Sequence, residues 1–106
     1  MKKRSFAEQV YNLTSQVPKG RVTTYGAIAK KLRRPQASRA VGRILGANPH
    51  PIVVPCHRVV KSDGGLGGYT SPRGIRMKIE LLTEEGVEIG DGKIDLSRFL
   101  FKDFAL

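Results

Sequence analysis

The residues of this chain that could do chemistry gather in the stretch PIVVPCHRVV, residues 51–60, which holds its single cysteine. His57 follows Cys56 directly, and an imidazole is a base that can take a proton from a thiol, directly or through a water. Arg58 adds positive potential, which favours the thiolate. Because a thiolate is a nucleophile, this grouping indicates covalent chemistry at sulfur.

The grouping works only if the backbone turns at this point. Adjacent side chains on a strand point to opposite faces, so a continuous strand would separate Cys56 from His57. Pro55 fixes the backbone before the cysteine, and we expect a tight turn over residues 55–58. A free cysteine is more often an inert core residue. The residues alone therefore leave two interpretations open, a reactive thiolate and a structural thiol.

The charge of the chain is divided unevenly along its 106 residues, a length that fits one domain. The net charge is +10; residues 1–79 hold 16 Lys and Arg against 2 acidic residues, whereas residues 80–106 hold 3 against 7. A basic body predicts a polyanionic partner such as nucleic acid. A solubilising surface, a ribosomal protein or a membrane-surface protein would show a similar charge.

Several classes of protein are excluded by composition. No apolar run approaches the roughly 20 residues that span a bilayer, and the start MKKRSF lacks the apolar segment of a signal peptide. One cysteine cannot form an internal disulfide, nor build a zinc site by itself. We expect a reduced protein of the cytoplasm, or of the nucleus if the source is a eukaryote.

Helical spacing of apolar residues predicts helices over residues 5–17, 25–32 and 36–47. Ser5 and Glu8 have the spacing of a capping box at the start of the first helix. The second and third helices flank the turn around RRPQ, which fits a helix-turn-helix pair. On the third helix, Gly42 lies beside Arg39 and Arg43 on the face opposite the apolar one. Glycine destabilises a helix by about 1 kcal/mol relative to alanine. A helix that carries this cost beside two arginines indicates a face that approaches a negatively charged partner closely. The alternative is a surface helix that tolerates glycine.

The second half of the chain alternates between extended and helical patterns. Residues 51–61 are rich in β-formers, and SDGGLGGY predicts a turn, with a hairpin or a loop there. Ile75, Ile79 and Leu82 mark a last helix over residues 72–85, which Gly86 ends. Residues 88–106 have mixed polarity and either dock on the body or fray.

These motifs together resemble one known family. VPCHRVV, with ASRAVGRILGANP before it and GGYTSP and EEG after it, is similar to the O6-alkylguanine-DNA alkyltransferase family (methylated-DNA–protein-cysteine methyltransferase) from about residue 5 to residue 87. The resemblance implies a catalytic and DNA-binding domain over residues 1–87 and a C-terminal extension over residues 88–106, without the usual N-terminal domain. The expected fold is mainly α with a short β hairpin, a winged helix-turn-helix-like domain of three to four helices.

The same resemblance implies catalytic roles for five residues. Cys56 would accept the alkyl group of O6-alkylguanine once and irreversibly, with His57 as its base through a bridging water. Glu85 would orient the imidazole, and Asn48 would brace the turn that carries the cysteine. Tyr25 would help rotate the nucleotide and donate a proton to the guanine as it leaves, which suits a phenol that is protonated at neutral pH.

Duplex DNA containing O6-alkylguanine is the partner that the resemblance implies, bound by a monomer that needs no cofactor and no metal. Arg39 would enter the base stack in place of the rotated base. The small face of the third helix would enter the minor groove; its residues are Ser38, Gly42 and Arg43, with Tyr25 nearby. Val59, Tyr69 and Thr70 would line the pocket for the base.

Two other functions are compatible with this sequence. Alkyltransferase-like proteins of about this size bind alkylated DNA without repairing it and carry tryptophan or alanine at the cysteine position, and Cys56 argues against that interpretation. The second alternative is that the chain is a module cut from, or normally fused to, another repair enzyme.

Overall fold

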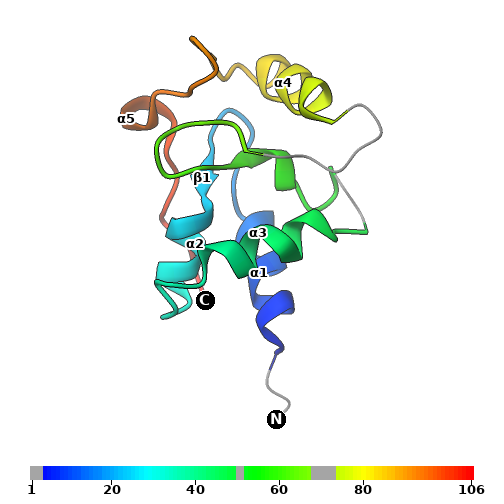
Figure 1. Cartoon of the computed structure of the whole chain (residues 1–106), viewed down its shortest axis with the longest axis vertical. Coiled ribbons are helices and arrows are strands. Elements are labelled where there is room, and N and C mark those ends of the chain that lie inside the picture. The colour runs from blue at the N-terminus through cyan, green and yellow to red at the C-terminus, as the bar shows by residue number, and fades with distance from the viewer. Residues whose placement is uncertain (1–3, 50–51, 68–73) are drawn as a thin grey trace.

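The described part of the fold has helices at both ends, with a short sheet between them (Figure 1). The computed structural model describes residues 4–49, 52–67 and 74–106. Its elements are α1 (Phe6–Ser15), β1 (Thr23–Thr24), α2 (Tyr25–Lys31), α3 (Ser38–Gly46), the 3-10 helix η1 (Cys56–Arg58), β2 (Val59–Val60), α4 (Ile75–Glu84) and α5 (Leu96–Phe99). Among the described residues, no helix has the length and apolarity needed to cross a membrane.

The first helix begins where its capping residues predict. Ser5 Oγ accepts from the amide of Glu8 at 3.1 Å, and Glu8 Oε1 accepts from the amide of Ser5 at 3.0 Å, which completes the capping box. Thr24 caps α2 in the same way, accepting from the amide of Ala27 at 2.9 Å. This cap sets the first turn of α2, where Tyr25 lies.

Helices α2 and α3 pack against each other and confirm the predicted helix-turn-helix pair. Val41 and Leu45 of α3 face the core, whereas Arg39 and Arg43 are exposed. The mainly helical fold is therefore confirmed.

The sheet is not the hairpin that the sequence suggested. The strands β1 and β2 pair in parallel, with Thr23 opposite Val59 and Thr24 opposite Val60. A parallel pair joins segments far apart in the sequence, and this one is held by cores on both sides. Val59 packs in the first core and Val60 in the second.

These two cores divide the molecule. The first core joins α1, α2 and α3 to Cys56 and Val59, and the second joins β2 and Val22, directly before β1, to α4 and the C-terminal segment. The first core contains Val10, Leu13, Val17, Ile28, Ala29, Val41, Leu45, Cys56, Val59 and Phe104. The second contains Val22, Val60, Leu82, Val87, Ile94 and Phe99.

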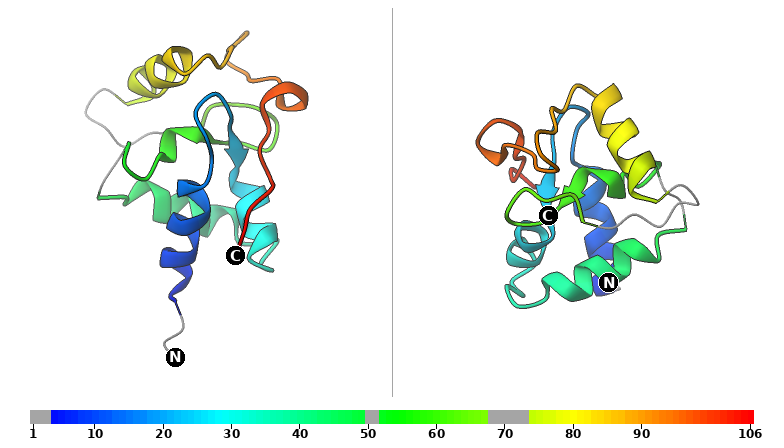
Figure 2. Two further views of the ribbon diagram at one scale, coloured as in Figure 1. Left: turned by 180° about the vertical axis from the view of Figure 1, so that it is seen from behind. Right: turned by 45° about the horizontal axis from the view of Figure 1, so that its top comes forward.

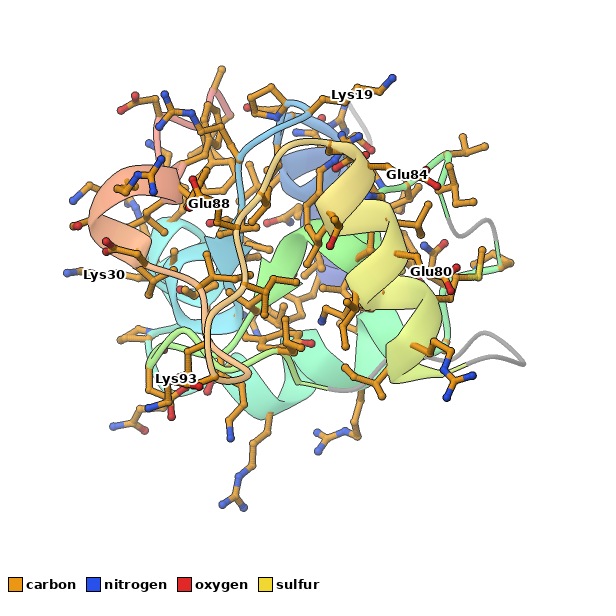
Figure 3. The ribbon with its side chains drawn as sticks, turned by 90° about the horizontal axis from the view of Figure 1, so that it is seen from above. Lys19, Lys30, Glu80, Glu84, Glu88 and Lys93 are labelled. Carbon is orange, nitrogen blue, oxygen red and sulfur yellow. The ribbon has the colours of Figure 1, made fainter. Side chains whose placement is uncertain are left out.

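Helix α4 buries a different face from the one expected. Leu82 is buried as predicted, but Ile75 and Ile79 are exposed and Lys78 takes an inward position. Seen from above in Figure 3, Glu80 and Glu84 point outward from α4, while Lys30 lies at the opposite edge of the molecule. Residues 72 and 73, where the helix was expected to begin, lie outside the described residues.

The C-terminal segment docks on the body. Its chain runs from α5 past β1 towards α2 (Figures 1 and 2). Val22 donates its amide hydrogen to Phe99 and accepts from the amide of Phe101, and Phe104 fills the first core. The amide side chain of Gln16 makes two hydrogen bonds to the backbone of Ala105, at 2.6 and 2.8 Å.

Candidate functional site

The backbone turns at the cysteine, as the pairing of a thiol with an imidazole requires. Residues Cys56–Arg58 form one 3-10 turn, in which the amide of Arg58 donates to the carbonyl of Pro55 at 2.9 Å. The amide of Cys56 donates to the carbonyl of Val54 at 2.7 Å. The tight turn over residues 55–58 is confirmed, so Cys56 and His57 need not point to opposite faces.

The thiol of Cys56 lies at the edge of the first core. The residue is 5% exposed and packs among the helices α1, α2 and α3. Burial lowers the pKa of Lys78 and raises that of Tyr25, and a negative charge on Cys56 has a smaller, raising effect on both pKa values, so the sulfur lies within electrostatic reach of both side chains. Only a group inserted into the protein surface could contact this sulfur.

His57 is fully buried and faces a carboxylate. Its Nε2 atom lies 3.0 Å from Glu85 Oε2, at the end of α4. The carboxylate accepts, so Nε2 carries the proton and Nδ1 is the basic nitrogen. Nδ1 is buried and has no hydrogen-bond partner among the residues that the structure describes. This is the contact that an orienting role of Glu85 requires, and the role itself stays a prediction.

Burial decides the charge of the imidazole. It lowers the pKa of His57 below its ordinary value and outweighs the hydrogen bond and negative charge of Glu85, which act in the opposite direction. His57 is therefore neutral at pH 7 and able to accept a proton. Burial also raises the pKa of Glu85, but hydrogen bonds from Arg58 and His57 outweigh that effect, and the pKa stays below its ordinary value.

Arg58 makes its hydrogen bonds to groups other than the cysteine. Its Nε donates to Glu85 Oε1 at 2.9 Å and one terminal nitrogen donates to Oε2 at 2.6 Å. The other terminal nitrogen donates to the carbonyl of Val17 at 2.8 Å. The guanidinium is thus committed to Glu85 and to the chain that follows α1, and not to the cysteine.

Asn48 braces the loop before the turn. Its Nδ2 donates to the carbonyl of Val54 at 2.9 Å, and the residue is nearly buried after the end of α3. The bond connects the helix-turn-helix pair to the loop that leads into Cys56. Such a bond fixes where the turn lies relative to α3.

Tyr25 forms one wall beside the cysteine. Burial and the charge of Cys56 raise its pKa, so the phenol is protonated at neutral pH. Gly67, at a φ of 71°, lies against the ring: a Cβ placed there would be 3.0 Å from the Tyr25 hydroxyl. Only a residue without a side chain fits this approach, and sequence reasoning did not single out Gly67.

A hollow of about 340 Å³ lies beside the exposed face of α3. The structure brings four of the five predicted DNA-binding residues together there, Tyr25, Ser38, Arg39 and Gly42. Lys61 and Ser62 complete its lining and were not predicted. The sequence feature that could have identified them is that they are polar residues directly after a buried strand. Arg43 is exposed on α3 but does not line the hollow.

Lys78 is a further residue that the sequence did not indicate. Its side chain is fully buried, and its Nζ donates to the carbonyl of Val59 at 2.8 Å. Burial lowers its pKa to about 8, partly offset by the charge of Cys56. Val59, predicted to line the base pocket, therefore lies beside a buried cation. Tyr69 and Thr70, the other predicted pocket residues, lie outside the described residues.

Comparison with known proteins assigns these features to a family. Residues 5–87 match the family described as 6-O-methylguanine DNA methyltransferase, DNA binding domain. The chain is 45% identical over 95 residues to a bifunctional methyltransferase/endonuclease of Picrophilus torridus, covering 90% of this chain and 31% of that protein. It is 47% identical over 81 residues to a methylated-DNA–protein-cysteine methyltransferase of Methanosarcina acetivorans, covering 76% and 51%. The chain thus spans about half or less of the length of these curated relatives.

Solved structures give the same grouping. The S. pombe protein Atl1, in a crystal structure with damaged DNA containing O6-carboxymethylguanine, matches with a TM-score of 0.82 and 32% identity, over 96% of this chain and 99% of that one. The Mycobacterium tuberculosis OGT, in a crystal structure with DNA, matches with a TM-score of 0.73 and 40% identity, over 80% and 51%.

Proposed function

The chain belongs to the 6-O-methylguanine DNA methyltransferase family, and we propose that it repairs duplex DNA by moving the alkyl group of O6-alkylguanine to its own Cys56. The observation that carries this proposal is a thiol in the same 3-10 turn as a neutral imidazole that is held by a carboxylate. This is the general arrangement of nucleophile, base and orienting group.

The proposed reaction uses the geometry of the turn. His57 Nδ1 takes the thiol proton through a bridging water, and the Cys56 sulfur attacks the alkyl carbon. A carbon–sulfur bond forms as the bond from that carbon to O6 breaks, and Tyr25 gives a proton to the departing guanine. The proton held by His57 then restores the phenol, so the protein gains only the alkyl group. A thioether has no easy hydrolytic exit, and each molecule acts once.

DNA would bind at the hollow beside α3. Arg39, Gly42 and Lys61 line the hollow. Lys61 supplies a positive charge for the phosphates, and Gly42 gives α3 a face without a bulky side chain. Cys56 is so little exposed that a base stacked in the duplex could not touch it. The alkylated guanine must therefore leave the stack, which costs a few kcal/mol and favours bases whose pairing is already weakened.

Mass spectrometry tests the proposal. After incubation with a duplex carrying one O6-methylguanine, the peptide that contains Cys56 should gain one methyl group and never more than one per molecule. Cys56→Ser should abolish the gain while keeping affinity for the duplex. A protein that turns over continuously, or one that gains no mass, would contradict the proposal.

A second candidate function follows from one specific observation. Atl1 of S. pombe is matched along nearly the whole of both chains, which suits a protein that binds alkylated DNA and recruits another pathway. The same experiment separates the two: a binder holds the methylated duplex without changing its own mass. Cys56, beside its imidazole, favours transfer.

A further inference from the structure

Arg58 occupies a position that the transfer chemistry does not by itself require. Its guanidinium lies between the carboxylate of Glu85 and the carbonyl of Val17, and every nitrogen of its planar group makes a hydrogen bond. The side chains of Arg58 and Glu85 are only 12% and 10% exposed. A charged pair this well covered is strongly directional.

We infer that Arg58 is a positioning residue for His57: it fixes the Glu85 carboxylate so that the imidazole keeps its proton on Nε2 and its lone pair on Nδ1. The inference rests on the proposed function, because it concerns the base of the proposed transfer. Arg58 does not touch the thiol or the bound base in this scheme; it acts through Glu85.

The Oε2 atom of Glu85 is shared between His57 and Arg58. Glu85 Oε2 accepts from His57 at 3.0 Å and from Arg58 at 2.6 Å, while Oε1 accepts from Arg58 at 2.9 Å. Two parallel bonds hold the plane of the carboxylate, so Oε2 can face the imidazole in only one direction. A lysine would supply the positive charge but not two parallel hydrogen bonds to the carboxylate.

A hydrogen bond to another segment holds the Arg58 guanidinium independently of Glu85. The bond to the carbonyl of Val17 holds the guanidinium against the chain that leaves α1. Pro18 follows Val17 and stiffens the backbone there. The carboxylate is therefore aligned by a fixed point outside α4.

The charge of Arg58 matters as much as its shape. Among the described residues, the charged groups that act on the imidazole are Glu85 at the end of α4, Lys78 of α4 and Arg58 of the same turn. Burial has the largest effect and keeps the imidazole neutral, Glu85 draws a proton towards it, and the charge of Arg58 acts in the same direction as burial. A base that is already protonated cannot accept the thiol proton, so Arg58 adds to burial in keeping His57 available.

Nitrogen NMR of the two histidines tests this inference without DNA. In the wild-type protein, His57, assigned by comparison with His57→Gln, should show the tautomer with its proton on Nε2. In Arg58→Met, the midpoint of His57 protonation should rise by about one pH unit or more. The acid limb of the methyl-transfer rate should move to higher pH by the same amount. An unchanged midpoint and tautomer in Arg58→Met would overturn the inference.

Two further variants isolate the cause. Arg58→Lys keeps the charge but loses the fork: we expect a mixture of tautomers, slower transfer and a midpoint near that of the wild type. If Arg58→Met does not fold, Arg58→Lys decides, and a wild-type tautomer and rate in it would contradict the positioning role. Arg98→Met is the matched control, because Arg98 pairs with Glu88 at 2.9 Å on the exposed surface, and it should change neither readout.

The design keeps this inference separate from the proposed function. If the wild-type protein does not transfer methyl groups, the NMR midpoints still report whether Arg58 sets the proton of His57. If transfer occurs but the midpoint ignores Arg58, only the present inference fails.

Discussion

The Nζ atom of Lys78 lies 2.8 Å from the carbonyl oxygen of Val59, on a side chain that is fully buried. Burial lowers the pKa of this amine to about 8 from 10.5. Between these values the unfolded chain binds more protons than the folded one, so the free energy of unfolding rises with pH in this window. Below about pH 8, the folded protein carries the full cost of the buried charge.

Lys78→Met should remove this dependence. The wild-type protein should gain up to roughly 3 kcal/mol in the free energy of unfolding between pH 8 and pH 10.5, whereas the variant should gain much less. Urea unfolding at pH 7, 8.5 and 10 measures both. Lys93→Met, at an exposed lysine, should keep the wild-type profile; parallel profiles for all three proteins would show that Lys78 is not the source.

Asn48→Asp should loosen the loop that leads into Cys56. The carboxylate keeps the shape of the amide but cannot donate to the carbonyl of Val54, which lies 2.9 Å away. We expect a loss of about 1–2 kcal/mol in unfolding free energy, with a larger loss in transfer rate. Asn12→Asp, on α1, is the control. Wild-type stability and rate in Asn48→Asp would rule out the bracing role.

Gly42→Ala should move stability and DNA affinity in opposite directions. An added Cβ would lie 3.9 Å from the ring of Tyr25, an ordinary contact, and alanine favours a helix by about 1 kcal/mol. The free protein should therefore be more stable, while the thicker helix face should weaken duplex binding, measured by fluorescence anisotropy. Ser15→Ala, at the exposed end of α1, should leave affinity unchanged. Equal affinity of Gly42→Ala and wild type would mean that α3 does not approach DNA closely.

Arg39→Ala should slow the reaction on duplex DNA more than on single strands. Arg39 is exposed beside the hollow that contains Tyr25 and Gly42, so it can fill the space of a rotated base. Because unstacking costs a few kcal/mol, we expect a slowing of about tenfold or more on duplex substrate. Single-turnover rates on both substrates give the ratio, with Arg76→Ala on α4 as the control. The same slowing on both substrates would exclude the finger role.

Local signals in the sequence predicted the helices and the turn. The capping box of Ser5 and Glu8 and the spacing of Val10 and Leu13 act within one helix, so they can be identified without knowing the fold. The contact between His57 and Glu85 followed only from the resemblance, because 28 residues separate them.

Features that depend on distant packing could not be predicted in this way. The parallel pairing of residues 23–24 with residues 59–60 depends on two cores that form together. The burial of Lys78 contradicts the usual preference of lysine for the surface, and only the position of the Val59 carbonyl explains it. The direction of Arg58 depends likewise on where the ends of α1 and α4 meet.

The paired bonds between Gln16 and Ala105 give this protein an unusual reporter. Backbone amides of exposed residues outside helices and strands, as Ala105 is, normally exchange their hydrogen for deuterium almost at once. The amide of Ala105 is held by a side chain at the end of α1, so its exchange is slowed until the C-terminal segment lifts off. Its deuterium uptake therefore times the opening of the core around Phe104, which is the core that also holds the sulfur of Cys56.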